Sequence, residues 1–152
     1  EGLMSREEIA QAFVCTMVRN PWDRVVSYYH WLRTQTFDHP VVGLAKALPF
    51  AEFLREPQVV EGFVRNPYES YLCDGAGVEH AGAVYVRLEH LAEDLAPVEA
   101  VCGFDIALTR ANESARGRDW RPFYTNADAE QAAQFCAKDI ARFGYVFDPE
   151  AA

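Results

Sequence analysis

The feature that most constrains the fold is an apolar run that ends at a helix start. Residues 13–18 form a nearly continuous apolar stretch of strand length, which is typical of a strand buried on both faces in a parallel sheet. Asn20-Pro21 follows almost at once. Because Asn is a favoured N-cap and Pro is favoured at the first helical position, a helix is predicted from there to about Arg33. A buried strand that turns directly into a helix indicates an α/β fold.

The rest of the chain continues this alternation. The pattern predicts helices over 6–12, 50–56, 91–101 (bent or split by Pro97) and 127–143, a second buried strand over 83–88, an extended piece over 68–72 and a loop over 110–123. Ser5-Arg6-Glu7-Glu8 has the form of a capping box, and Gly103 and Gly144 follow their helices in the C′ position. Residues 145–147 are expected to pack behind the last helix. Within the helix after Asn20, helical spacing predicts a core face and an opposite polar stripe, formed by Val25, Tyr28, Tyr29 and Leu32 and by Asp23, Ser27, His30 and Thr34.

Composition narrows the classes of function. The chain has 152 residues, half of them hydrophobic, which suits one domain, 1–152, with a single core. Its net charge of −9 argues against a general nucleic-acid surface but allows one small anion pocket. No apolar run reaches the length of a membrane span and no signal peptide opens the chain, so we expect a cytoplasmic protein.

The four cysteines form no metal-binding pair. None of them lies in a CxxC spacing, so neither a zinc site nor any other metal is expected. Cys15 and Cys136 lie within apolar stretches and are predicted to be small buried hydrophobic residues. Cysteine usage of this kind fits a reducing compartment.

An anion pocket is predicted where the first strand meets its helix. Arg19 ends the strand directly before a helix N-terminus, whose N–H groups and partial positive charge favour anions. Ser27 lies near two turns further on, on the polar stripe, where its hydroxyl can donate to the same anion. The alternative interpretation is an ordinary strand–helix corner in which Arg19 pairs with Asp23 or with a helix end.

The residues around this corner resemble a known signature. The order Arg19-Asn20-Pro21-Trp22-Asp23-Arg24, followed by Ser27 and Tyr28, is similar to the 3′-phosphate-binding motif of sulfotransferases that use 3′-phosphoadenosine 5′-phosphosulfate (PAPS). The bacterial and carbohydrate sulfotransferases resemble it most. This resemblance implies that Arg19 and Ser27 hold the 3′-phosphate of the nucleotide.

Two later regions resemble the same family in the same order. They are residues 83–94, which read AVYVRLEHLAED, and the set 112–116, 124–125 and 139–145, which ends DIARFGY. The resemblance therefore covers about residues 8–148. Arg87, at the end of the second strand, is expected either to face the cofactor or to pair with Glu89 or Glu93. The segment 110–121 carries a net charge of +2, and we expect Arg116 and Arg118 either to cover the nucleotide or to lie in a solvated loop.

The resemblance implies a fold and an activity. The expected fold is a P-loop-type sulfotransferase domain with helices around a parallel sheet. The expected reaction is transfer of a sulfuryl group from PAPS to a hydroxyl of a saccharide or small metabolite, with PAPS as co-substrate and no metal. Association between copies of the chain is compatible with this reading. The alternatives are a non-catalytic module that binds adenosine 3′,5′-bisphosphate, and a P-loop nucleotide kinase relative.

The catalytic residues of the family are harder to place. A lysine loop that cradles the 5′-phosphosulfate is expected upstream of the signature, but residues 1–17 contain no lysine. We therefore expect either that the first strand–loop–helix unit is missing from residues 1–152 or that the protein is a degenerate relative of the family. In both cases these residues alone are expected to transfer no sulfate. Candidates for the base that takes the acceptor proton are His30, His39 and His80, although His30 is expected to point into solvent. The acceptor is expected to meet the segments 36–51 and 75–82.

Overall fold

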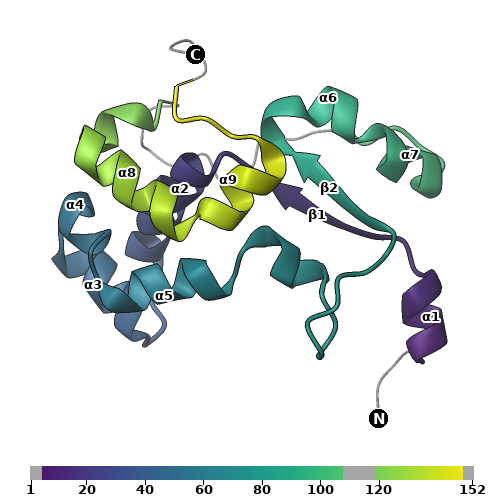
Figure 1. Cartoon of the computed structure of the whole chain (residues 1–152), viewed down its shortest axis with the longest axis horizontal. Helices are drawn as coiled ribbons and strands as arrows, with labels where there is room; N and C mark the ends of the chain where they lie inside the picture. Colours follow the sequence, from purple (N-terminus) through teal and green to yellow (C-terminus); the bar gives the residue numbers. More distant parts are fainter. Residues whose placement is uncertain (1–4, 108–118, 149–152) are drawn as a thin grey trace. The chain divides into compact units, whose positions relative to one another are not determined.

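The two apolar runs predicted as strands pair with each other. In the computed structural model, which describes residues 5–107 and 119–148, β1 (Val14–Val18) and β2 (Ala83–Arg87) form a two-stranded parallel sheet. The register places Val14 beside Ala83 and Val18 beside Arg87, so both strands end at the same edge (Figure 1). The chain is thus an α/β protein whose described residues form mostly helices and this small two-stranded parallel sheet.

The chain divides into two compact units. The first unit comprises Glu1–Arg19 and Tyr68–Leu108, and the second comprises Asn20–Pro67 and Thr109–Ala152. Besides its strands, the first unit contains α1 (Arg6–Gln11), η1 (Tyr68–Leu72), η2 (Leu88–His90), α6 (Leu91–Asp94) and α7 (Ala96–Cys102). The second unit contains α2 (Pro21–Thr34), α3 (Pro40–Ala47), α4 (Phe50–Phe53), α5 (Pro57–Arg65), η3 (Arg121–Phe123), α8 (Asn126–Phe135) and α9 (Ala137–Phe143).

The burial of β1 differs from the prediction. Val18 is buried and Val14 and Thr16 are half-buried, whereas Cys15 is exposed and Met17 is 51% exposed. Because successive side chains of a strand point to opposite faces, β1 has only one covered face within the described part of the first unit. The predictions that this strand is buried on both faces and that Cys15 is buried are therefore wrong.

Two further predictions concern the first unit, one for residues 68–72 and one for the helix around Pro97. Residues 68–72 form the 3₁₀ helix η1, so the predicted extended piece is wrong. Pro67 precedes this helix with a φ suited to a helical turn, and the ring of Tyr68 is buried beneath it. The split predicted near Pro97 is confirmed, since α6 ends at Asp94 and α7 begins at Ala96. Gly103 ends α7 at φ 75°, a conformation that favours glycine.

Helix α2 is the centre of the second unit, as its sequence predicts. Asn20 caps it by accepting a hydrogen bond from the N–H of Trp22 at 3.0 Å, and Pro21 occupies its first position. Its buried face packs against α3, α4 and α8 (Figure 1). The core that results is made of Trp22, Val25, Val26, Tyr29, Leu32, Val41, Val42, Ala45, Phe50, Phe53, Leu54, Val59, Phe63, Ala132, Phe135 and Cys136.

Helices α3 and α5 were not predicted. Both begin with a proline at the first position, as α2 does, and His39 caps α3 through its ring. The proline at the first helical position, which was one part of the signal for α2, was thus present in both helices. The candidate acceptor loop over residues 36–51 is wrong as a loop, because most of it is α3 and the start of α4. Val41, Val42 and Ala45 of α3 are buried in the core.

The last predicted helix consists of two helices. Thr125 and Asp128 form a capping box at the start of α8, but the helix breaks at Cys136 before α9. Gly144 ends α9 at φ 67°. After it, Phe147 packs edge-on against Trp22 of α2, with ring centroids 5.6 Å apart, while the ring of Tyr145 lies 6.1 Å from that of Phe143 in α9.

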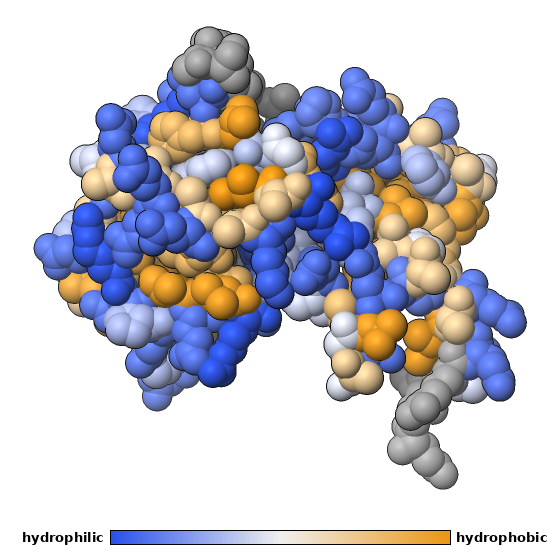
Figure 2. Space-filling view, in the orientation of Figure 1, coloured by the Kyte–Doolittle hydropathy of each residue, from blue (hydrophilic) through white to orange (hydrophobic). Residues whose placement is uncertain are grey.

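The face shown in Figure 2 carries orange, hydrophobic groups among blue, hydrophilic ones. The exposed large apolar residues are Ile9, Phe13, Met17, Trp31, Phe37, Val64, Tyr71, Val78, Val101, Phe104 and Val146. No helix within the described ranges has the length and hydropathy that crossing a bilayer requires.

Candidate anion-binding site

The first unit brings two predicted cofactor residues to one edge of its sheet. Arg87 is the last residue of β2 and lies in register with Val18, and Arg19 comes directly after Val18. Both arginines are half-buried. Ligands of open parallel sheets bind beyond the carboxyl ends of the strands, and arginine is well suited to phosphate. This edge is therefore the candidate anion-binding site.

The main chain at Arg19 is held by Tyr68, a contact that was not predicted from the sequence. The N–H of Arg19 donates to the hydroxyl of Tyr68 at 3.2 Å, and Tyr68 is 6% exposed. The tetrapeptide Val-Arg-Asn-Pro occurs twice in the sequence, at 18–21 and at 64–67, and Tyr68 follows its second copy. Neither that repeat nor the spacing of apolar residues signals this contact, which joins positions 49 residues apart.

Arg87 is held by Asp94, a partner that was not among those predicted. Its Nε donates to Oδ2 at 2.7 Å, its Nη2 donates to Oδ1 at 2.9 Å, and its main-chain N–H donates to Oδ2 at 2.9 Å. Glu89 and Glu93 were the expected partners. A two-point arginine–carboxylate contact of this kind has a defined geometry, which fixes the plane of the guanidinium group.

The Arg87 hydrogen bonds also change the acidity of Asp94. Together with the charge of Arg87, they outweigh the effect of burial and lower the pKa of Asp94 from 3.8 to about 2. A carboxyl group whose pKa is lower in the folded state stabilises the fold fully above its unfolded pKa. This contribution is lost as the pH falls from about 4 to about 2.

Asp94→Asn is expected to weaken the acid dependence of stability. The wild-type protein should lose about 1–2 kcal/mol more free energy of unfolding than the variant between pH 5 and pH 2. Urea unfolding followed by circular dichroism at the two pH values measures this difference. Glu93→Gln, an exposed neighbour in α6, is the control and should behave as the wild type. Equal acid dependence in wild type and Asp94→Asn would contradict the assigned ion pair.

Ser27 and the start of α2 belong to the second unit. Ser27 is half-buried in the second turn of the helix. The N-terminus offers fewer backbone donors than its sequence suggested: Pro21 has no N–H, and the N–H of Trp22 is donated to Asn20. Neither of the first two positions of α2 therefore offers a backbone N–H to an anion.

Three histidines were candidate bases. In two of them, His80 and His39, the ring nitrogen that would accept a proton already accepts a hydrogen bond from the main chain. The Nδ1 of His80 accepts from the N–H of Gly82 at 3.1 Å, and its Nε2 lies 2.9 Å from the carbonyl of Ile9. Because Nδ1 faces a donor, Nε2 carries the proton in the neutral ring. The Nδ1 of His39 likewise accepts from the N–H of Val41 at 3.2 Å.

The expectation that His30 points into solvent is wrong. The residue is half-buried, and its ring packs edge-on against Phe123 with centroids 5.0 Å apart. His30, which lies on a stripe that is polar by sequence, is covered here by Phe123 of η3, and no periodicity within α2 indicates this contact. His30 is thus part of the packing of the second unit.

The second arginine of the signature has a structural contact. The Nη1 of Arg24 lies 2.8 Å from Oδ2 of Asp139, and its Nη2 donates to the carbonyl of Asn66 at 2.8 Å. The guanidinium group also lies 5.2 Å from the ring centre of Phe63. Because the side chains of Arg24 and Asp139 are 14% and 3% exposed, the pair is buried. It connects the signature to the DIARFGY segment.

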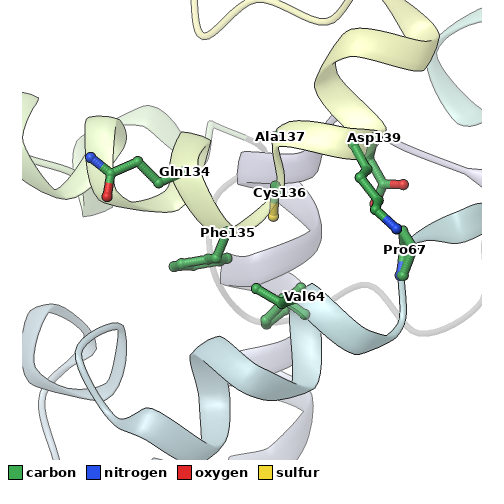
Figure 3. Close-up of a pocket in the computed structure, with 9 residues that line it drawn as sticks. Val64, Pro67, Gln134, Phe135, Cys136, Ala137 and Asp139 are labelled. Carbon is green, nitrogen blue, oxygen red and sulfur yellow. The ribbon is translucent and has the colours of Figure 1, made fainter.

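A small pocket lies between α5 and the junction of α8 and α9. Figure 3 shows the sulfur of Cys136 pointing into the space beside Val64. The volume of about 90 Å³ has room for about three waters, far less than the several hundred Å³ of a typical ligand pocket. Burial raises the pKa of the Cys136 thiol to about 12, so this cysteine is an inert core residue, as predicted.

Arg116 and Arg118 lie outside the described residues. Comparisons of the chain with protein-family models, with curated proteins and with solved structures find no match.

Proposed function

We propose that this protein is a PAPS-dependent sulfotransferase with a P-loop-type α/β fold. It transfers a sulfuryl group from PAPS to a hydroxyl of a saccharide or small metabolite. The observation that carries this proposal is the position of the signature. Its first arginine, Arg19, stands at the carboxyl end of a parallel strand, and Arg87 ends the neighbouring strand.

Electrostatics supports a selective anion site at this edge. The chain carries a net charge of −9, so its overall field repels anions and binding must come from local cations. Arg19 and Arg87 supply two of them. In the proposed complex Arg19 and Ser27 hold the 3′-phosphate, while Arg87, Arg116 and Arg118 assist in binding the nucleotide.

The proposed reaction is a displacement at sulfur. The acceptor oxygen forms a bond to sulfur as the bond from sulfur to the 5′-phosphate oxygen breaks, and that oxygen leaves with the electron pair. A base takes the proton of the acceptor hydroxyl. In the family that the chain resembles, donors to the leaving oxygen come from a lysine loop. Arg19 and Ser27 position the nucleotide, which by itself does not lower the barrier.

An aromatic strip on the second unit suits a saccharide acceptor. Trp31 and Phe37 are 50% and 48% exposed, and their ring centroids are 6.1 Å apart. Tyr28 stacks on Trp31 at 6.0 Å with an interplanar angle of 21°. Exposed aromatic faces of this kind can stack on the apolar C–H face of a sugar ring. Trp31 lies one helical turn after Ser27, on the same face of α2.

Calorimetry on the 152-residue chain tests the proposal. Adenosine 3′,5′-bisphosphate is expected to bind about 10- to 100-fold more tightly than ADP, because charge-assisted hydrogen bonds to the 3′-phosphate contribute about 1.5–3 kcal/mol. Adenosine 2′,5′-bisphosphate has the same groups with one phosphate moved, so it is the matched control and should bind weakly.

The other outcomes favour the other classes of protein. Tighter binding of ADP would favour a nucleotide kinase relative. Selective binding of the 3′,5′-bisphosphate by a full-length protein that transfers no label from radiolabelled PAPS to sugars or phenols would favour a non-catalytic binding module. Absence of binding to every nucleotide would contradict the proposed function.

A further inference from the structure

The contact between Arg87 and Asp94 has a geometry that suits a ligand site. Asp94, the last residue of α6, reaches back to β2 and accepts three hydrogen bonds from Arg87, two from the side chain and one from the main chain. Arginine carries five side-chain N–H donors, and the carboxylate takes two of them along one edge of the guanidinium group. The plane and direction of that group are thereby set.

The exposure of the two side chains distinguishes this pair from the buried pair in the second unit. The carboxylate of Asp94 is 15% exposed while the side chain of Arg87 is 35% exposed. In the Arg24–Asp139 pair, the side chain of Arg24 is 14% exposed and that of Asp139 is 3% exposed. Arg87 is therefore the more accessible arginine, and it stands at the sheet edge where β1 and β2 end.

We propose that Asp94 is a positioning residue that holds Arg87 ready for a phosphate group of the nucleotide. This inference rests on the proposed function. A free arginine side chain must lose its rotational freedom when it binds an anion, and a residue that is already fixed loses less. Asp94 thus increases affinity by ordering Arg87 before the nucleotide arrives. The low pKa of Asp94 keeps its carboxylate ionised at neutral pH.

If Asp94 instead competed with the nucleotide for Arg87, its substitution would change the affinity in the opposite direction. A carboxylate beside an arginine also neutralises its charge, and a carboxylate that only competed with the ligand would weaken binding of phosphate. Removing the charge of Asp94 would then strengthen binding. The sign of the effect therefore separates a positioning residue from a competitor.

The test measures binding of adenosine 3′,5′-bisphosphate to variants of the whole chain. Asp94→Asn is expected to bind about 10-fold more weakly than wild type, and Arg87→Ala at least as weakly. In the double variant the Asp94 substitution should cause no further loss, because it acts through Arg87. Glu93→Gln removes the same charge from the adjacent position, whose side chain is 75% exposed, and should bind as wild type.

Two further measurements separate positioning from folding. Asp94→Glu keeps the charge but moves the carboxylate by one methylene, and it should fold as wild type and bind about 3-fold more weakly. The NMR signal of the Arg87 Nε–H should be sharp in the free wild type and in Glu93→Gln, and broadened in Asp94→Asn. These measurements keep the inference testable if Asp94→Asn is poorly folded.

Three results would overturn the inference. They are unchanged or tighter binding by a folded Asp94→Asn variant, an additional loss from this substitution in the Arg87→Ala background, and an Arg87 Nε–H signal that stays sharp without the carboxylate. Absence of bisphosphate binding by the wild type would instead contradict the proposed function itself. The two failures are therefore distinguishable.

Discussion

Asp139→Ala is expected to destabilise the protein by about 3–5 kcal/mol, the usual cost of removing one partner of a buried ion pair. The substitution leaves the guanidinium group of Arg24 without its carboxylate in a position that is only 14% exposed. The carbonyl of Asn66 and the ring of Phe63 still contact that group, but neither carries a charge. Urea unfolding followed by circular dichroism measures the change in the free energy of unfolding.

The matched control is an ion pair on the surface of the same unit. Glu61 pairs with Arg65 one turn along α5, and the two side chains are 56% and 73% exposed. Glu61→Ala is expected to cost less than about 1 kcal/mol, since exposed pairs contribute little. A similar small cost for Asp139→Ala would mean that Arg24 and Asp139 are not paired in a buried environment.

Arg19→Ala is expected to reduce the affinity for adenosine 3′,5′-bisphosphate by about 10- to 100-fold, or about 1.5–3 kcal/mol. The loss should occur without unfolding, because the contact with Tyr68 is made by the main-chain N–H of residue 19 and alanine retains it. Calorimetry measures the affinity, and thermal unfolding of the same samples verifies the fold.

The control for this variant must remove a positive charge without affecting the fold. Arg24→Ala, which would otherwise be the natural comparison within the signature, is unsuitable because Arg24 pairs with the buried Asp139. Arg65→Ala removes an exposed arginine instead, and its effect on affinity should be less than about threefold. Comparable losses in Arg19→Ala and Arg65→Ala would indicate a diffuse electrostatic effect and not a site at the end of β1.

Several elements were predictable because their causes are local. Ser5, Asn20 and Thr125 cap the helices that follow them through bonds to residues two or three positions away. Gly103 and Gly144 end helices because a left-handed conformation is needed there. A proline opens α3 and α5 as well, so the starts of these two helices were also predictable from a local signal.

Other features depend on contacts between distant residues. The continuous apolar run of β1 does not determine how many of its faces are covered, and the exposure of Cys15 and Met17 follows from what packs against the strand. His30 is covered by Phe123, 93 positions later in the sequence. Whether a side chain is covered depends on contacts with distant segments that form on folding, so the sequence of one helix or strand does not determine it.

The candidate site shows the same division. The sequence by itself determined that Arg19 ends a strand and that Asn20 and Pro21 start a helix, because backbone geometry and capping act over a few residues. Only the tertiary structure decided the partners of the arginines. Arg87 pairs with Asp94, which was not among its predicted partners, and Arg24 pairs with Asp139, 115 residues away. Ion pairs form between groups that folding brings together, and sequence distance does not determine that proximity.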